Sequence, residues 1–319
     1  MLKAGLPATI VNIIHNWYNK LFVSVRWNGV YSNPFRVGSG VRQGSTLSPT
    51  LFNMFMNIFI LKLKGAGIGC HIMNMFCGCF LYADDIIILS PSVCGLQRML
   101  DVCFNTGNLL YLKFNCDKSH CIFFGKCSKM CPEPMYLGTN TIQWTDSIKY
   151  LGIHVISGKC MSFDIDPIKR SFYAACNSIT VRAQHLDEIV HLSLQESYCL
   201  PILTYATAAM SLTKKQLQEL NVCWNSIYRS IFHFNRWESV KVFIQGLGRL
   251  DLVHILEVSR IKYYHHVLQG RNTVLYNLLW KYCADNFLYD ACLGSIFVTK
   301  NAAISSCYND FAIICSTTI

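Results

Sequence analysis

Two adjacent aspartates, Asp84 and Asp85, interrupt an otherwise apolar stretch: FCGCFLY precedes them and IIIL follows. Taking carboxylates out of water is costly unless a cation or hydrogen-bond donors meet them. A hairpin turn between two buried strands is one place where both carboxylates can stay near water. The pattern therefore predicts strands over Phe76–Tyr82 and Ile86–Leu89, joined by a turn at residues 83–85.

Two interpretations of the acidic pair stay open on these residues alone. Aspartate is common in turns, so a plain polar turn accounts for one of them. It accounts less well for a pair held between apolar strands. A divalent cation would remove the conflict, because Mg²⁺ prefers oxygen ligands and is often held by one or two carboxylates together with substrate phosphates.

A glycine-rich loop, Gly40–Gly44, precedes a predicted helix that starts at Ser48 and Pro49. Serine is a favourable N-cap and proline suits the first helical position. The loop GVRQG offers backbone N–H groups, a guanidinium and a side-chain amide, which are groups that phosphates and base edges bind. The apolar stripe predicted to be buried comprises Leu51, Phe52, Phe55, Met56, Phe59, Ile60 and Leu63.

Together these motifs resemble the reverse transcriptases of non-LTR (LINE-type) retrotransposons. The matching segments, in chain order, are Gly40–Gly44 with the helix after it, Leu81–Asp85 as the metal-binding hairpin, Asn115 and Lys118 in FNCDK, and Lys149–Gly152 as the hairpin that grips the primer end. The resemblance runs in order from about Leu6 to Val155.

The resemblance implies an RNA-directed DNA polymerase, in which a primer 3′-hydroxyl attacks the α-phosphate of a deoxynucleotide on an RNA template. It implies a two-ion Mg²⁺ site, with Asp84 and Asp85 as metal ligands and catalytic residues. The positions implied to bind the nucleotide are Gln43, Gly44, Tyr82, Ala83 and Lys118. Those implied to lie against the template or primer are Arg42, Leu151 and Gly152.

The same family uses a third carboxylate from a strand upstream of the region that this chain resembles. No aspartate or glutamate precedes Asp84 in the chain, whereas Asp101, Asp117 and Asp146 follow it. We therefore expect an N-terminally truncated polymerase that is inactive alone. Two alternatives are a non-catalytic nucleic-acid-binding remnant and a structural fragment without a ligand.

The second half of the chain has a largely helical pattern. The helices predicted there lie over a face from Ile165 to Ile179 and over Leu192–Met210, Gln216–Phe232, Leu250–Leu268 and Thr273–Ala284, with a weak strand at Ile296–Val298. Near the start, a helix after Pro7 and a hairpin at Asn28-Gly29 are expected. The predicted fold is α+β: a partial right-hand polymerase palm, an antiparallel sheet with helices, over residues 1–157, then a mainly helical thumb-like and C-terminal region over residues 158–319.

The composition is consistent with this assignment. The net charge is +10, from 28 basic and 18 acidic residues, which suits a polyanionic partner. The N-terminus has no signal-peptide pattern and no run suits a membrane helix, so we expect an intracellular protein, nuclear or cytoplasmic, with its 17 cysteines reduced. Cys116, His120, Cys121, Cys127 and Cys131 are close in sequence, but they lack the paired spacing of a structural zinc site.

Overall fold

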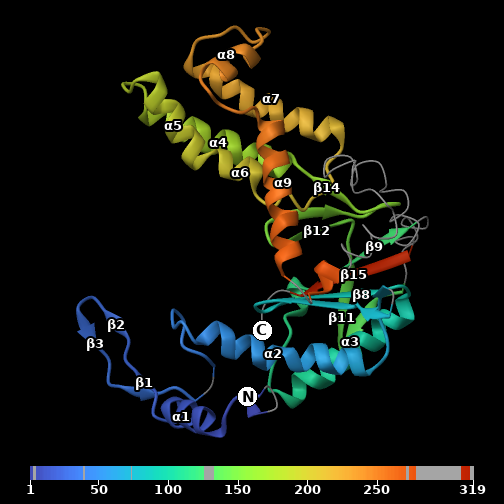
Figure 1. Ribbon diagram of the computed structural model, residues 1–319. Coiled ribbons are helices and arrows are strands. Elements are labelled where there is room, and N and C mark those ends of the chain that lie inside the picture. The colour runs from blue at the N-terminus through green and yellow to red at the C-terminus, as the bar shows by residue number, and fades with distance from the viewer. Residues whose placement is uncertain are drawn as a thin grey trace.

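The computed structural model describes residues 1–2, 5–38, 40–72, 74–125, 133–270, 273–277 and 310–316. Its elements follow a curved path, with a central sheet, a helical region at one end and an N-terminal arm at the other (Figure 1). This arrangement confirms the predicted α+β class, with a sheet followed by a mainly helical region.

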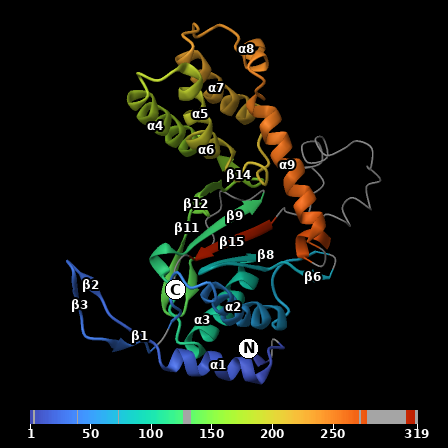
Figure 2. The same cartoon turned by 60° about the vertical axis from the view of Figure 1, so that its left-hand side comes forward.

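The central sheet has six strands in the order β10-β11-β9-β15-β8-β7. Their bounds are Cys79–Tyr82 for β7, Asp85–Ser90 for β8, His120–Gly125 for β9, Met135–Leu137 for β10, Asn140–Trp144 for β11 and Asp310–Ser316 for β15. Only the β9–β11 pair is parallel. The strand β15 comes from the far end of the sequence and lies between β8 and β9, antiparallel to both (Figure 2).

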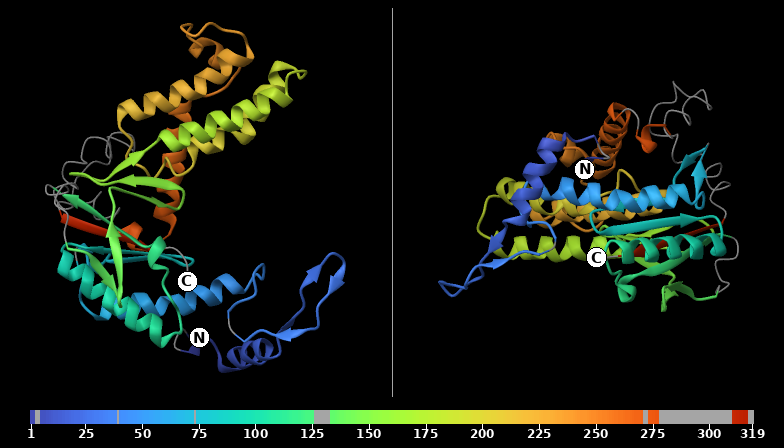
Figure 3. Two further views of the ribbon diagram at one scale, coloured as in Figure 1. Left: turned by 180° about the vertical axis from the view of Figure 1, so that it is seen from behind. Right: turned by 90° about the horizontal axis from the view of Figure 1, so that it is seen from below.

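Helices α2 (Ser48–Gly65) and α3 (Val93–Leu109) cover one face of this sheet (Figure 3). Alternate residues of β8, Ile86 and Ile88, are buried in one cluster with Phe59 of α2 and Met99 of α3. Side chains of a strand alternate between faces, so Asp85 and Ile87 point to the opposite face. The helix α3 begins after Ser92, whose hydroxyl caps it by accepting a hydrogen bond from the N–H of Gly95.

The N-terminal arm consists of α1 (Ala8–Asn19) and a long hairpin. The hairpin contains β1 (Phe22–Val23) paired with β4 (Phe35–Arg36), and β2 (Arg26–Trp27) paired with β3 (Val30–Tyr31). Its turn is Asn28-Gly29, as predicted, and both residues have positive φ, as a type I′ turn requires. A smaller hairpin of β5 (His71–Ile72) and β6 (Met75–Phe76) precedes β7.

A second, three-stranded sheet joins the central sheet to the helical region. It contains β12 (Ser147–Tyr150), β13 (Ile153–Ile156) and β14 (Ser162–Asp164). Ile148 of β12 is buried against Ile122 and Phe124 of β9, on the face of the central sheet opposite α2 and α3. Val155 contacts both this cluster and the core of the helical region, so the hairpin β12–β13 is the joint between the two parts.

The helical region packs its own core. Its helices are α4 (Asp166–Arg182), α5 (Glu188–Tyr198), α6 (Leu200–Thr204), α7 (Lys214–Ile231), α8 (Lys241–Gly246) and α9 (Leu252–Gln269). Trp224 and Tyr228 of α7 are buried among Phe172 of α4 and Leu203 of α6. A capping box, formed by Thr213 and Gln216, starts α7. No helix in the described ranges is long and apolar enough to cross a membrane.

Several local predictions were wrong. Ser48 is the first residue of α2 and does not cap it, because its hydroxyl donates to the Arg42 carbonyl instead. Phe55 on the predicted buried stripe is 37% exposed, because α2 buries only the side that faces the sheet. A continuous strand is also suggested by the apolar pattern from Ile148 to Val155, but this segment forms two strands with a turn.

The helix predicted over Leu192–Met210 is interrupted. It ends at Tyr198 and resumes in the short α6, where Pro201, which has no N–H to donate, occupies the first turn. Helix α8 was not predicted. Of the helix predicted over Thr273–Ala284, residues 274–277 are helical, and the remainder lies outside the described residues, as does the strand predicted at Ile296–Val298.

Candidate functional site: an acidic hairpin on the open face of the sheet

The acidic pair lies at a two-residue hairpin turn between β7 and β8. Tyr82 pairs with Asp85, so the turn residues are Ala83 and Asp84, and Asp85 is the first residue of β8. The predicted turn therefore ends one residue earlier than expected. Ala83 has a φ of 52°, and only this first turn residue has positive φ, as in a type II′ turn.

The hairpin presents Asp85 on the face of the sheet that α2 and α3 leave open. Cross-strand pairs lie on one face, so Tyr82 and Phe80 share this face with Asp85 and Ile87. Tyr82 is exposed and Asp85 is half-buried. The opposite face carries Cys79 and Ile86, which pack into the helix-covered core. The strand alternation thus places the carboxylate and the tyrosine where a ligand can reach both.

The ionised form of the Asp85 carboxyl is disfavoured in the chain without a bound cation. Partial burial, and then the neighbouring charge of Asp84, raise its pKa above the ordinary value. No cation of the chain pairs with either aspartate in the described residues. Both effects favour an arrangement in which a bound cation balances the pair.

The sheet register places Lys118 near the acidic hairpin. Cys315 of β15 pairs with Ile87 on one side and with His120 on the other, so β8 and β9 start at the same end of the sheet. Two strand spacings separate β8 from β9, roughly 10 Å. Lys118 closes the short helix η2 (Cys116–Lys118) just before β9, where the Asn115 side chain accepts hydrogen bonds from the N–H groups of Asp117 and Lys118.

The glycine-rich loop is fixed at one point. The Arg42 carbonyl accepts hydrogen bonds from the Ser48 hydroxyl (2.6 Å) and the Ser45 N–H (3.3 Å). Arg42, Gln43 and Gly44 are exposed, and Gly44 has a φ of 79°. In the described residues no hydrogen bond or ion pair joins these loop side chains to Asp84 or Asp85. The free chain thus does not link the two segments directly.

The Leu151-Gly152 turn is the tip of the joint hairpin β12–β13, whose Ile148 packs on the same open face. Both residues have positive φ, 45° and 81°, and a left-handed conformation costs a non-glycine residue about 1–2 kcal/mol. Tyr205, after α6, donates its hydroxyl to the Leu151 carbonyl at 2.9 Å. Its ring lies against Gly152, where an added Cβ would be 3.3 Å from Cε1. One such hydrogen bond contributes about 1 kcal/mol, which is comparable with the strain.

Sequence reasoning missed Tyr205. Its contact spans 54 residues of chain, and nothing in the local sequence PILTYATAAM distinguishes this tyrosine from a surface residue. Only the placement of α6 beside the joint hairpin identifies it.

Residues 2–155 match the family described as "Reverse transcriptase (RNA-dependent DNA polymerase)". They include the acidic hairpin, the glycine-rich loop, η2 and the joint hairpin. These residues form a reverse-transcriptase domain of the non-LTR retrotransposon type. The predicted resemblance is therefore confirmed.

Relatives of the reverse-transcriptase domain come from insect mobile elements. The chain is 32% identical over 160 residues to the Retrovirus-related Pol polyprotein from type-2 retrotransposable element R2DM of Drosophila melanogaster, covering 47% of this chain and 15% of that protein. It is 26% identical over 176 residues to the RNA-directed DNA polymerase from mobile element jockey of Drosophila funebris, covering 53% of this chain and 19% of that protein. The chain thus spans less than a fifth of the length of these relatives.

The two carboxylates of the reverse-transcriptase domain suit Mg²⁺ in donor type, because both offer hard oxygen atoms at an accessible turn. In the part of the chain that the structure describes, however, no third His, Cys, Asp or Glu joins them in a metal-binding group. The strand beside β8 is β15, whose Ser316 pairs with Ile86. Of the cysteine cluster considered for zinc, Cys121 is buried, and Cys127 and Cys131 lie outside the described residues.

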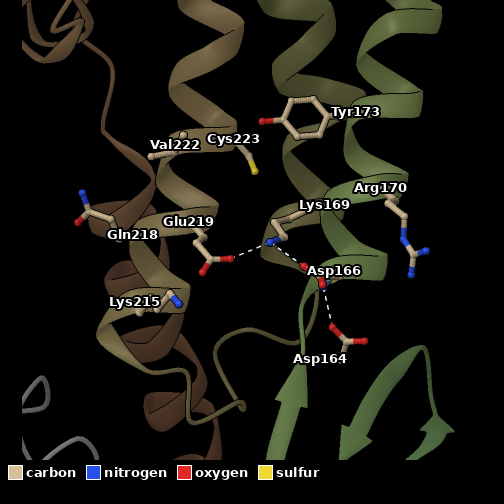
Figure 4. A pocket seen from close by; sticks show the side chains of 10 residues that line it. All are labelled: Asp164, Asp166, Lys169, Arg170, Tyr173, Lys215, Gln218, Glu219, Val222 and Cys223. Carbon is tan, nitrogen blue, oxygen red and sulfur yellow. Dashed lines mark hydrogen bonds and ion pairs between the residues drawn. The ribbon is translucent and has the colours of Figure 1, made fainter. Parts of the chain in front are cut away.

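A hollow of about 730 Å³ lies outside the reverse-transcriptase domain, between α4 and α7 (Figure 4). Lys169 bridges Asp166 and Glu219 there, at 2.7 Å to each. These contacts raise the pKa of Lys169 and lower that of Asp166. Its other charged residues are Asp164, Arg170 and Lys215, so cations and carboxylates balance, and the hollow does not select either sign of ligand.

Proposed function

We propose that the acidic hairpin is part of the catalytic centre of an RNA-directed DNA polymerase, which transfers a deoxynucleotide to a primer 3′-hydroxyl on an RNA template. The observation that carries this proposal is the placement of Asp85 and Tyr82 together on the open face of the sheet, with η2 at the same end. The membership of residues 2–155 in the reverse-transcriptase family supports it.

Each residue has a role that follows from its chemistry. Asp84 and Asp85 would hold Mg²⁺, which when bound would neutralise charge on the triphosphate. Lys118, an exposed cation, would approach the triphosphate. Tyr82 would lie against the incoming nucleotide, with the Ala83 backbone beside it. Positioning and charge neutralisation are what phosphoryl transfer chiefly needs from a protein.

The remaining predicted residues would position nucleic acid. Gln43 and Gly44 would contact the nucleotide and its template base after the loop 40–44 moves against the hairpin. Arg42 would lie near template phosphates, and the turn Leu151-Gly152 would support the primer strand. The net charge of +10 favours binding of RNA and DNA at low salt.

We also propose that the chain does not complete the centre alone, because the described residues supply two carboxylates and no third. A non-catalytic nucleic-acid-binding remnant is the second candidate, favoured by the exposed basic residues Lys149, Lys159 and Arg170 along the joint and α4. We further propose that residues 1–157 form a partial palm domain and that residues 158–319 form a helical thumb-like and C-terminal region.

A cleavage experiment tests the metal site without relying on activity. Fe²⁺ can replace Mg²⁺ at carboxylate sites and, with ascorbate and peroxide, cuts the backbone nearby. We expect cuts around residues 84–85 that Asp84→Ala abolishes and excess Mg²⁺ suppresses. Asp146→Ala, which removes an exposed aspartate after β11, is the matched control. Cuts that are absent, or that persist in Asp84→Ala, would refute the metal site.

Primer extension on an RNA template with Mg²⁺ tests whether the chain completes the catalytic centre alone. We expect no extension by this chain, together with primer–template binding that weakens steeply as salt rises. Robust extension that Asp84→Ala abolishes would contradict the proposed incompleteness. Binding that is present while Fe²⁺ cleavage is absent would favour the non-catalytic remnant.

A further inference from the structure

We propose that Tyr205 is a positioning residue, which holds the Leu151-Gly152 turn in its left-handed conformation and so couples the helical region to the place where the primer end lies. This inference rests on the proposed function, which places the primer at this turn. It adds a residue outside the part of the chain that matches the reverse-transcriptase family, since that match ends at residue 155.

The turn does not maintain its own conformation well. Type I′ turns favour Asn-Gly or Gly-Gly, because both central residues need positive φ. The arm hairpin has that preferred pair, Asn28-Gly29, whereas the joint hairpin has Leu151 at the first position. Unfavourable backbone conformations persist where the surroundings fix them, and Tyr205 provides two such contacts, a hydrogen bond to Leu151 and ring packing on Gly152.

Local hydrogen bonds and buried neighbours fix the backbone at Tyr205. Its N–H donates to the Pro201 carbonyl at 2.9 Å, and the Thr207 hydroxyl donates to the Thr204 carbonyl at 2.8 Å. Thr207 and Leu203 are almost completely buried. The anchor is therefore the core of the helical region, and a movement of that core would reach the turn through one side chain.

The side chain of Tyr205 is also accessible, at 57% exposed. A tyrosine buried only for stability would show little surface, whereas this one has its hydroxyl on the turn and much of its remaining surface in solvent. The turn is likewise at the surface, since Gly152 is exposed. A nucleic-acid strand lying on the open face of the sheet could contact both.

The decisive variants are Tyr205→Phe, which removes only the hydroxyl, and Tyr205→Phe combined with Leu151→Asn. Asparagine tolerates the left-handed region, so it should restore the turn without the hydrogen bond. Tyr198→Phe, on the exposed side of α5, is the matched control. Hydrogen–deuterium exchange of the β12–β13 hairpin reports the turn directly, in the full chain without ligand.

Photo-crosslinking reports the primer position. A DNA primer with 4-thiothymidine at its 3′ end, annealed to RNA, is irradiated with the full chain, and crosslinks to residues 149–153 are quantified by mass spectrometry. Loss of one hydrogen bond should reduce this crosslink roughly fivefold and speed exchange in the hairpin by a similar factor. Leu151→Asn should restore slow exchange in the hairpin, and Tyr198→Phe should change neither readout.

The outcomes separate the two claims. If the wild-type chain crosslinks at 149–153 and Tyr205→Phe does so equally, the proposed function stands and the role of Tyr205 is refuted. If the wild-type chain gives no crosslink there, the primer assignment fails and this inference fails with it. If Tyr205→Phe loses the crosslink but hydrogen exchange in the β12–β13 hairpin is unchanged, the turn is not what Tyr205 positions, and the inference is again refuted.

Discussion

The N-terminal arm and the helical region both carry tryptophans, but they differ in what they do with them. Trp27 at the tip of the arm hairpin is 82% exposed, whereas Trp224 of α7 is 1% exposed. The arm has local hydrogen bonds and almost no core of its own, because Ile14 is the one residue of α1 that is buried. Because the helical region has a closed core, we expect it to maintain its own shape. The shape of the arm depends instead on its turn and on its attachment to α2.

The largest expected effect tests that contrast through the two tryptophans. Trp224 packs edge-on against Tyr228, with ring centroids 5.8 Å apart. We expect Trp224→Ala to lower the free energy of unfolding by about 3–5 kcal/mol, because it leaves a cavity in a closed core. Trp27→Ala should change it by less than about 0.5 kcal/mol. Urea denaturation measures both, and similar losses for the two variants would show that the arm is packed after all.

Gly29 and Gly152, the second residues of the arm turn and of the β12–β13 turn, test the same difference between a poorly packed and a well-packed region. Gly29 has open space around it, whereas a Cβ on Gly152 would contact the Tyr205 ring. Both have positive φ, so alanine is strained at either position. We expect Gly152→Ala to destabilise the protein by about 1–2 kcal/mol, and Gly29→Ala by less, because the arm can rearrange alone. Thermal unfolding of the two variants, side by side, checks the order.

Much of the sheet region could be predicted because its signals are local. The pair Asn28-Gly29 predicts its turn, Ser92 predicts its helix start, and the apolar runs around Asp84 predict two strands. The strand order could not be predicted in this way. Strand β15 lies between β8 and β9, more than 180 residues away along the chain, and no periodicity of the sequence encodes such a pairing.

The candidate site divides in the same manner. Asp84, Asp85 and Lys118 lie in the segments on which the family resemblance rests, so the sequence predicts them as site residues, and the sheet register brings these segments to one end of the sheet. Tyr205 belongs to no such motif. The Ser48 hydroxyl was assigned to the wrong partner, because a serine before proline suits a helix cap equally well and only the folded loop offers it the Arg42 carbonyl.

The attachment of the arm can be tested at that hydrogen bond. Ser48 is buried at the start of α2, and its hydroxyl anchors the loop that carries Gln43. We expect Ser48→Ala to cost about 1 kcal/mol of stability and to speed hydrogen exchange in residues 40–47. Thr50→Ala, an exposed change two residues further along α2, should do neither. If exchange in the loop is unaffected by Ser48→Ala, another contact holds the arm.

The smallest expected effect concerns the half-buried carboxylate of Asp85, at the start of β8. An aspartate in an unfolded chain titrates at about 3.9, and partial burial followed by the charge of Asp84 raises the pKa of Asp85 in the folded protein. As pH rises past the unfolded value, the unfolded state releases this proton first, so ionisation of Asp85 lowers the stability of the folded state across the window between the two values, and the loss persists above it.

Asp85→Asn removes that loss. The variant should therefore be more stable than the wild-type chain at neutral pH, and the difference should vanish as the pH falls below about 4. Asp146→Asn, which makes the same change at an exposed position, is the matched control. Adding Mg²⁺ at neutral pH should raise the melting temperature of the wild-type chain more than that of Asp85→Asn, because the cation relieves the same charge. A gain for Asp85→Asn that is equal at all pH values would mean that the amide packs better than the carboxyl, and that the sheet tolerates the charge of Asp85 without cost.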